Sequence, residues 1–196
     1  MIINTDAIVL KTFSYGETSL ISRCFTKDKG KISFIIKGAK SKKNLISPYF
    51  QPLSFINIIY KENEKRELQI VSKVSFVQIW TQIPLSLRKM SLSQSILEIS
   101  DFTLEKNDPY PSLFNILIKT LQIFESGDID ENILFWNYEF KILSEMGFMI
   151  NIDDNSDSEL ISLKRNDKII NTMQQLINGN ISDINLDTIS LDNRKK

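Results

Sequence analysis

The hydrophobic pattern of this chain changes its period near Pro84, and this change constrains the fold more than any other feature. Before Pro84, short segments rich in β-branched and aromatic residues are separated by turn residues, a pattern typical of β-strands. After it, apolar residues recur with the three- and four-residue spacing of amphipathic helices. A run of strands followed by a run of helices predicts an α+β protein whose strands and helices occupy separate regions.

Five short strands are predicted within residues 1–80. They cover residues 6–12, 19–26, 31–37, 53–60 and 67–79. Gly16 and Gly30 mark the first two turns, because glycine tolerates the backbone angles that a tight turn needs. Five strands suit a small barrel better than a two-sheet sandwich, which usually needs about seven. We therefore expect an N-terminal five-stranded OB-fold barrel followed by an all-helical domain.

Three helices are expected after the barrel. The first is indicated by an apolar stripe of Leu85, Leu92, Ile96, Ile99 and Phe102. The second begins at Pro111 and ends at Gly127, and the third covers residues 130–146, since proline favours a first helical turn and glycine the position after the last one. The expected organisation is an OB-fold nucleic-acid-binding domain at 1–80, a helical domain at 81–150, and an acidic, polar C-terminal segment at 151–196.

Charge is distributed unevenly along the chain although its total is zero. The whole sequence has 24 basic and 24 acidic residues, but residues 1–80 hold 13 basic and 6 acidic ones. No carboxylate lies between Asp28 and Glu62, a segment that contains Lys29, Lys31, Lys37, Lys40, Lys42, Lys43 and Lys61. Such asymmetry indicates a nucleic acid or another acidic surface as partner. The alternative is that the lysines only keep strand edges solvated.

The composition excludes the commonest kinds of catalytic site, which depend on histidine or on several cysteines. The chain contains no histidine and one cysteine, Cys24. These counts exclude a histidine-activated nucleophile, an imidazole metal ligand, a cysteine-built zinc site and an intrachain disulfide. No apolar run approaches the ~20 residues that span a bilayer, and the N-terminus lacks a secretory leader. We therefore expect a cytoplasmic, non-enzymatic protein without a cofactor, a metal or a membrane contact.

An OB-type barrel binds single-stranded nucleic acid on its second and third strands and on the neighbouring loops. Binding needs cations along the phosphate path and flat side chains on which bases stack. The cation candidates are Arg23, Lys29, Lys31, Lys37, Lys40, Lys42 and Lys43. Gly38 lies among them, and its lack of a side chain lets the backbone approach a phosphate. The aromatic candidates are Tyr15, Phe25, Tyr49 and Phe50, with packing in the core or in a turn as the alternative for each.

Lysine is a compact point charge on a flexible stem and reads bases poorly. The predicted binding is therefore sequence-tolerant and weakens as salt rises, with a slope of about 0.7 per phosphate contacted on a single strand. The residues around Gly38 lack the spacing of a nucleotide-binding phosphate loop, G-x-x-x-x-G-K-[ST].

Several short motifs occur in a characteristic order. They are Tyr15-Gly16-Glu17, Phe25-Thr26 before Gly30, Lys37-Gly38-Ala39-Lys40, Gln51-Pro52-Leu53, and the helical segments 111–124 and 138–148. In this order they resemble the recombination mediator RecO family over about residues 5–150. Each motif is short, and it is their order and spacing that make the resemblance specific.

The resemblance implies an N-terminal OB-fold, a helical domain and a role in recombinational repair of DNA gaps and breaks after DNA damage. Members of the family bind single- and double-stranded DNA and anneal complementary strands. They contact the tail of the single-strand-binding protein SSB and work with RecR to load RecA. None of these activities requires catalysis. By resemblance, the expected partners are therefore DNA, RecR, SSB and, indirectly, RecA.

Two departures from the family pattern are visible. Zinc-binding members carry four cysteines after the glycine that corresponds to Gly147, and residues 151–196 contain none, so no zinc is expected. The family's basic C-terminal helix is missing or reduced to residues 172–196, which makes this segment a shortened one. In the family the SSB tail docks in an apolar groove with a basic rim. The rim candidates here are Arg88, Lys89, Lys119 and Lys141, in a half of the chain with 18 acidic and 11 basic residues.

Three other functions stay open at the level of the sequence. One is a different single-strand binder, such as an RNA-binding OB protein, which would slow strand annealing. Another is a protein-interaction scaffold, for which replacing Lys40, Lys42 and Lys43 with glutamate would leave DNA affinity unchanged. The third is a Mg²⁺-dependent enzyme that uses carboxylates such as those of Asp153, Asp154 and Asp157, although a solvated acidic linker explains these residues better.

Overall fold

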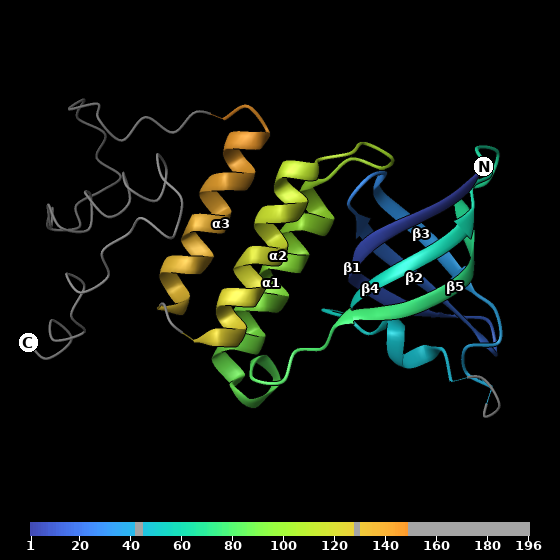
Figure 1. Ribbon diagram of the computed structural model, residues 1–196, viewed down its shortest axis with the longest axis horizontal. Helices are drawn as coiled ribbons and strands as arrows, with labels where there is room; N and C mark the ends of the chain where they lie inside the picture. Colours follow the sequence, from blue (N-terminus) through green and yellow to red (C-terminus); the bar gives the residue numbers. More distant parts are fainter. Residues whose placement is uncertain (42–44, 128–129, 149–196) are drawn as a thin grey trace, which may run out of the picture. The chain divides into compact units, whose positions relative to one another are not determined.

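The computed structural model describes residues 1–41, 45–127 and 130–148 (Figure 1). The chain divides into two compact units, Met1–Phe135 and Trp136–Lys196. The first unit holds all the strands described below together with the first two long helices. The barrel and these helices therefore form one body, and the contacts between them can be read directly.

Five strands close into a barrel in the first unit (Figure 1). They are β1 (Ile2–Tyr15), β2 (Ser19–Thr26), β3 (Gly30–Ile36), β4 (Phe55–Lys61) and β5 (Leu68–Gln78). Around the barrel they follow the order β1-β2-β3-β5-β4, in which β3 and β5 are parallel and the other pairs antiparallel. This is the five-stranded arrangement of an OB-fold, and it confirms the predicted fold class.

β1 is longer than the predicted strand at 6–12 because it takes part in two ladders. Residues 2–8 pair with β4, and residues 7–15 pair with β2. A bulge between Val9 and Lys11 follows the change of partner. Because a bulge bends and twists its strand, it lets one strand serve both sides of the barrel.

The barrel interior is filled by side chains from alternate positions of the strands. The even-numbered apolar residues of β2 and β3 point inward and are buried: Leu20, Cys24, Ile32, Phe34 and Ile36. The ring of Phe34 meets that of Tyr60 edge-to-face, with 5.2 Å between the centroids. The odd-numbered residues of these strands point outward, because successive side chains alternate between the two faces of a sheet.

The connection from β3 to β4 contains a short 3₁₀ turn, η1 (Ser47–Phe50). Phe50 is fully buried in the barrel core. The ring of Tyr49 is stacked on that of Phe76 of β5, with 4.4 Å between the centroids. The turn is thus fixed to the barrel by two aromatic side chains. The segment between β3 and this turn contains Lys37, Lys40, Lys42 and Lys43, and we call it the basic loop.

The helical region begins with a second 3₁₀ turn and continues with three helices. These elements are η2 (Ile83–Leu85), α1 (Leu87–Thr103), α2 (Pro111–Ser126) and α3 (Glu131–Glu145). The Ser86 hydroxyl caps α1 by accepting the backbone N–H of Lys89 at 3.3 Å. The three predicted helices are confirmed. Two residues of the predicted α1 stripe are not packed, because Leu85 and Phe102 are 79% and 94% exposed.

Candidate nucleic-acid interface

The outer face of β1, β2 and β3 is where an OB-fold binds nucleic acid, and here the helices cover one end of it. Phe25 is fully buried, with its ring 5.4 Å from that of Phe114 on α2. Lys31 lies opposite Phe25 on β3 and is 8% exposed. The backbone N–H of Asn107, between α1 and α2, donates to the carbonyl of Lys31 at 3.1 Å. We call this region, with Phe25 and Lys31 at its centre, the covered end.

Three charged side chains meet at the edge of the covered end. Nη1 of Arg23 donates to both carboxylate oxygens of Asp101 on α1, at 3.0 and 2.9 Å. Nζ of Lys31 donates to the backbone carbonyl of Asp101 at 2.5 Å and lies 4.0 Å from its carboxylate. Burial lowers the pKa of Lys31, and the Asp101 carboxylate offsets part of that effect. Lys31 therefore helps to hold α1 on the barrel, and its burial disfavours the predicted contact with phosphate, which stays a prediction.

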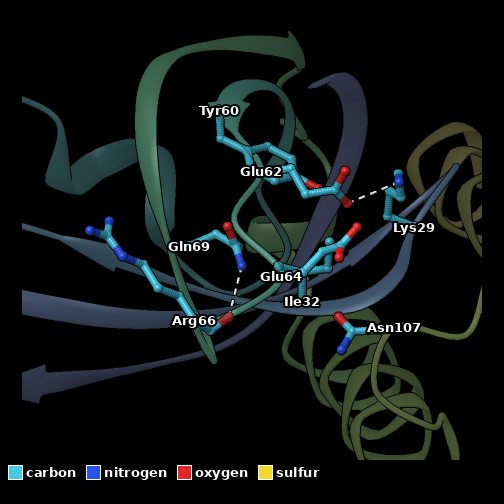
Figure 2. Close-up of a pocket in the computed structure, with 8 residues that line it drawn as sticks. All are labelled: Lys29, Ile32, Tyr60, Glu62, Glu64, Arg66, Gln69 and Asn107. Carbon is cyan, nitrogen blue, oxygen red and sulfur yellow. Dashed lines mark hydrogen bonds and ion pairs between the residues drawn. The ribbon is translucent and has the colours of Figure 1, made fainter. Parts of the chain in front are cut away.

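Lys29 also lies away from the basic loop, in the turn between β2 and β3. Its Nζ is 2.9 Å from a carboxylate oxygen of Glu62. A pocket of about 240 Å³ opens here, lined by Lys29, Ile32, Tyr60, Glu62, Glu64, Arg66, Gln69 and Asn107. Figure 2 shows the carboxylates of Glu62 and Glu64 on the side of Lys29, whereas the guanidinium of Arg66 points away. Two carboxylates beside one lysine disfavour a phosphate at this place.

The opposite end of the same face is open to solvent and carries the basic loop. Lys37 and Lys40 are exposed where β3 ends. Gly38 lies between them with a φ of 67°, in the left-handed region that favours glycine. The backbone N–H of Lys40 donates to the carbonyl of Thr18 at 2.9 Å and so holds the loop beside the β1–β2 turn. In the described parts of the chain, neither lysine forms an ion pair.

The predicted aromatic residues differ widely in exposure. Tyr15, in β1 beside the basic loop, is 52% exposed. Tyr49 is partly buried by its stacking on Phe76. Phe25 and Phe50 are fully buried, one against α2 and one in the barrel core. Phe25 and Phe50 thus adopt the packed alternative that the sequence leaves open for them. Lys42 and Lys43 lie outside the described residues.

A row of partly exposed apolar side chains crosses the open end. The sequence pattern within any one β-strand does not reveal this row, because it depends on how the strands pair. The ladder register places Phe13 opposite Ile21, Ile21 opposite Ile35, and Ile35 opposite Ile70 of β5. These four side chains, which we call the apolar row, face outward. The guanidinium carbon of Arg23 lies 5.2 Å from the centre of the Phe13 ring. The open end comprises this row, Tyr15 and the basic loop.

The four basic residues predicted to rim an apolar groove lie on three helices. Arg88 and Lys89 are in the first turn of α1, and Nε of Arg88 is 3.8 Å from the carboxylate of Glu131. Lys119 is exposed on α2, and Lys141 belongs to the second unit. The charge of Arg88 is partly compensated by Glu131, and the groove itself stays a prediction.

The described part of the chain also bears on metal binding, thiol chemistry and membrane insertion. Residues 1–41, 45–127 and 130–148 contain no group of three histidine, cysteine or acidic side chains able to hold a metal ion. Burial raises the pKa of the Cys24 thiol to about 12, so the thiolate is absent near neutral pH. None of the described helices has the length and apolar character needed to cross a membrane. What the open end offers a ligand is positive charge and apolar surface.

Two family models match this chain, one on the barrel and one on the helices. The model for the N-terminal part of recombination protein O matches residues 1–80, and the model for its C-terminal part matches residues 84–168. The chain belongs to the recombination protein O, or RecO, family. These matches confirm the RecO family, which the motifs between Tyr15 and Phe148 predicted.

Curated relatives of this RecO-family chain carry the name DNA repair protein RecO. The one from Salinibacter ruber is 32% identical over 120 residues, which are 61% of this chain and 46% of the relative. The one from Streptococcus gordonii is 31% identical over 152 residues, 78% of this chain and 57% of the relative. The one from Chloroherpeton thalassium is 26% identical over 151 residues, 77% and 58% respectively. The chain spans about half the length of the curated relatives it matches.

Proposed function

We propose that this chain binds the phosphate backbone of single- and double-stranded DNA at the open end of its barrel and acts as a non-catalytic mediator of DNA repair and recombination. The observation that carries the proposal is the exposure of Lys37 and Lys40 on either side of Gly38, without an ion pair in the described part of the chain. Lys42 and Lys43 follow directly in the sequence and increase the positive charge of the loop.

The two ends of β3 explain why the open end is the better place for a phosphate. At the covered end, Lys29 faces Glu62, and Lys31 faces Asp101. At the open end, the exposed Glu17 lies in the β1–β2 turn, and within the described residues neither Lys37 nor Lys40 forms an ion pair. Positive charge that is not already matched within the protein is available to a phosphate at this end.

The size of the salt effect follows from the number of phosphates neutralised. On a single strand, the logarithm of affinity falls with the logarithm of salt by about 0.7 per contact. Contacts through Lys37 and Lys40 therefore contribute about 1.4 to this slope. A fourfold rise in salt would weaken binding about sevenfold through these two contacts alone.

The proposal is tested by measuring the binding of a fluorescently labelled single strand and of a duplex of equal length across a range of salt. The variant Lys37→Glu/Lys40→Glu is compared with Lys27→Glu/Lys65→Glu, which changes the net charge equally at exposed residues of the β2–β3 and β4–β5 turns. We expect the first variant to lose about tenfold in affinity and to show a flatter salt slope, and the second to change little. Equal losses in both variants, or binding independent of salt, would overturn the proposal.

We propose further that the chain works in the cytoplasm, anneals complementary strands, and cooperates with RecR, with the tail of SSB and, through RecR, with RecA. Membership of the RecO family supports this part of the proposal. Mixing complementary strands with and without the protein tests it, because a RecO-type mediator speeds duplex formation. Slower duplex formation would instead indicate a plain single-strand binder. Binding to purified RecR is measured separately, by a shift in the sedimentation of the labelled protein.

A further inference from the structure

We propose that the pocket of Figure 2 binds a small organic cation, with an ammonium or guanidinium head on a short aliphatic stem. The inference goes beyond the proposed DNA binding and does not depend on it, because the pocket opens beside the β2–β3 turn whereas the basic loop follows the other end of β3. The lining residues come from both of the turns that flank β3 and β5 at this end, from three strands, and from the connection between α1 and α2. Distant parts of the first compact unit therefore converge on this pocket.

Two residues that line the pocket belong to the barrel core. Ile32 and Tyr60 are 6% and 0% exposed and pack among the inward side chains. The pocket thus opens at one end of the barrel interior, and the mouth of a barrel is a common place for a ligand. The Tyr60 hydroxyl is buried, and none of the described residues forms a hydrogen bond with it. A buried hydroxyl without a partner costs free energy, so a ligand that supplies a hydrogen bond here gains affinity.

The Tyr60 hydroxyl is suited to accept an N–H group. In Figure 2 the Tyr60 side chain extends toward the Glu62 carboxylate, among the other lining residues. Burial and this carboxylate raise the pKa of Tyr60 to about 12, so the hydroxyl stays neutral at neutral pH. The lone pairs of a neutral phenol oxygen accept hydrogen bonds. A cationic N–H donor at this place is attracted by the nearby carboxylate as well.

The charges around the pocket favour a positive ligand. Lys29 and Glu62 neutralise each other across 2.9 Å. The carboxylate of Glu64 forms no ion pair within the described residues, and the guanidinium of Arg66 points away from the pocket. One negative charge is therefore left without a counter-ion beside the pocket, and hydrogen bonds between an ionised donor and a carboxylate are stronger than neutral ones.

The size of the pocket restricts the ligand to a small one. A volume of about 240 Å³ corresponds to about eight waters of 30 Å³ each and lies below the 300–1,000 Å³ typical of drug-sized ligands. Ile32 and the ring of Tyr60 offer contact to a short aliphatic stem. A divalent metal ion fits less well, because the described residues contain no group of three histidine, cysteine or acidic side chains that could hold one.

The wall that carries the carboxylates is fixed before any ligand arrives. Nε2 of Gln69 donates to the carbonyls of Asn63 and Arg66, both at 2.9 Å, and its Oε1 accepts the N–H of Asn63 at 3.0 Å. The N–H of Glu62 donates to the carbonyl of Met1 at 2.9 Å. These bonds hold the β4–β5 turn against the barrel. A pre-formed wall lowers the entropic cost of binding a small ligand.

The first test titrates the ¹⁵N-labelled full-length chain with n-butylammonium and n-butylguanidinium and follows its backbone amide signals by NMR. Butanol and butyrate, of similar size, are the neutral and anionic controls. We expect both cations to saturate with a Kd of about 1 mM and to shift the signals of residues that line the pocket. Butanol and butyrate should not saturate. Equal affinity for butanol and the cations, or no saturable shift at the lining residues, would overturn the inference.

The second test changes the pocket and its surroundings separately. Glu64→Gln removes the unmatched charge, and the control Glu67→Gln removes an exposed carboxylate of the same turn that does not line the pocket. We expect Glu64→Gln to weaken n-butylammonium binding about tenfold and Glu67→Gln to leave it unchanged. Equal losses in these two variants would show that the cation is attracted by net charge alone, which would overturn the inference.

Tyr60→Phe tests the hydroxyl without disturbing the fold, because the ring stays and the deleted hydroxyl has no partner among the described residues. Its Tm should equal or exceed that of the unmodified protein, and its affinity for n-butylammonium should fall about threefold. If Tyr60→Phe and Glu64→Gln both keep full affinity, the cation binds elsewhere and the inference is wrong.

The last measurement distinguishes two sources of the same head group, a free small amine and a basic side chain of another protein. Capped tripeptides with a central lysine, arginine or glutamine are titrated in the same way. Binding of the lysine or arginine peptide at least as tight as that of n-butylammonium would assign the pocket to a protein partner, whereas binding of the free cation alone would assign it to a small amine. Failure of every cation to bind would overturn the inference and leave the proposed DNA binding untouched, since that is measured through Lys37→Glu/Lys40→Glu.

Discussion

The covered and the open end of the β1–β2–β3 face are built from the same kinds of residue. Each presents a lysine near an aromatic ring at an outward position: Lys31 with Phe25 at the covered end, and Lys37 with Tyr15 at the open end. At the covered end α1 and α2 bury the ring and supply Asp101 as counter-charge. At the open end both side chains reach solvent. The strands are alike, and the helices decide which lysines are available.

This difference shows that a cluster of charge in a sequence is not yet a cluster of charge on a surface. The counter-ion of Lys31 lies on a helix that follows the barrel, and the counter-ion of Lys29 lies beyond the end of β4. Neither pairing can be recognised within the acid-free segment itself. Four predictions test the difference between the two ends through stability and DNA affinity, from the largest expected effect to the smallest.

The largest effect is expected for Gly30→Ala, which disturbs the packing of the covered end. An added Cβ would lie 1.9 Å from the backbone carbonyl oxygen of Asp108, and the φ of Gly30 is 68°. Because backbone would have to move, we expect the free energy of unfolding to fall by about 4 kcal/mol. The control is Gly16→Ala at the open end, where φ is 59° but no atom lies within 4 Å. It should cost about 1 kcal/mol. Urea unfolding measures both, and equal losses would contradict the close packing of the covered end.

A smaller loss is expected for Asp101→Asn. The substitution leaves the buried ammonium of Lys31 with the backbone carbonyl of residue 101 as its acceptor and removes the charge that faces Arg23. Removing one partner of a buried ion pair is strongly destabilising, and we expect a loss of about 2 kcal/mol because Arg23 can turn to solvent. Glu62→Gln breaks the more exposed pair with Lys29 and should cost less than about 1 kcal/mol. A larger loss for Glu62→Gln would reverse the comparison.

Glu125 on α2 tests the hydrogen bonds that hold residues 81–83, just before α1, against α2. Its carboxylate accepts the backbone N–H groups of Thr81, Gln82 and Ile83 and the hydroxyl of Thr81, at 2.6–3.0 Å. Burial raises the pKa of Glu125, but the hydrogen bonds lower it by more than burial raises it. The net result is a pKa of about 2, compared with the ordinary 4.5. The folded-state pKa is below the unfolded one, so the stabilisation is complete above about pH 4.5 and is lost as the pH falls toward 2.

Glu125→Gln should therefore lower the free energy of unfolding by about 1.5 kcal/mol at neutral pH. The difference from the unmodified protein should shrink as the pH falls through the window from 4.5 to 2. Urea unfolding at several pH values measures this. A difference that stays constant with pH would show that the carboxylate charge does not hold this junction.

The smallest effect is expected at the open end, for Glu17→Gln. Removing this exposed carboxylate from the β1–β2 turn should raise the affinity for a single strand about twofold at low salt, because a charge within a Debye length of the phosphates is only partly screened. The matched variant Glu64→Gln removes an exposed carboxylate beside the pocket of Figure 2 and should leave the affinity unchanged. Equal gains in the two variants would show that total charge governs binding, irrespective of the end of the barrel.

The number and kind of the elements follow from the sequence, because burial on one side imposes a period on each strand and helix. The alternation within β3 correctly separates the inward residues Ile32, Phe34 and Ile36 from the outward Ile35. The length of β1 does not follow, because its first and second halves face different partners. The burial of Phe50 does not follow either, since a residue of an irregular connection has no period that assigns it to the core.

The site is less predictable than the fold. Lys37, Lys40 and Tyr15 are exposed and Gly38 is partly exposed, as a binding loop requires, and their role stays a prediction. The apolar row depends on the register of four strands, which a single sequence does not contain. The pairing of Arg23 with Asp101 depends on how a helix lies on the barrel. Sequence patterns thus identify which residues point outward, whereas tertiary contacts decide what each of them meets.

The parallel contact between β3 and β5 is short, joining residues 33–35 to residues 68–70. These partners are about 35 positions apart in the chain, and contacts across such separations form slowly because a long loop has to close first. Among the described ladders, this contact is the only one that pairs Ile70, and it pairs it with Ile35. A strand of nucleic acid lying across both residues would resist their separation. It should therefore slow the unfolding rate of the barrel more than it accelerates refolding.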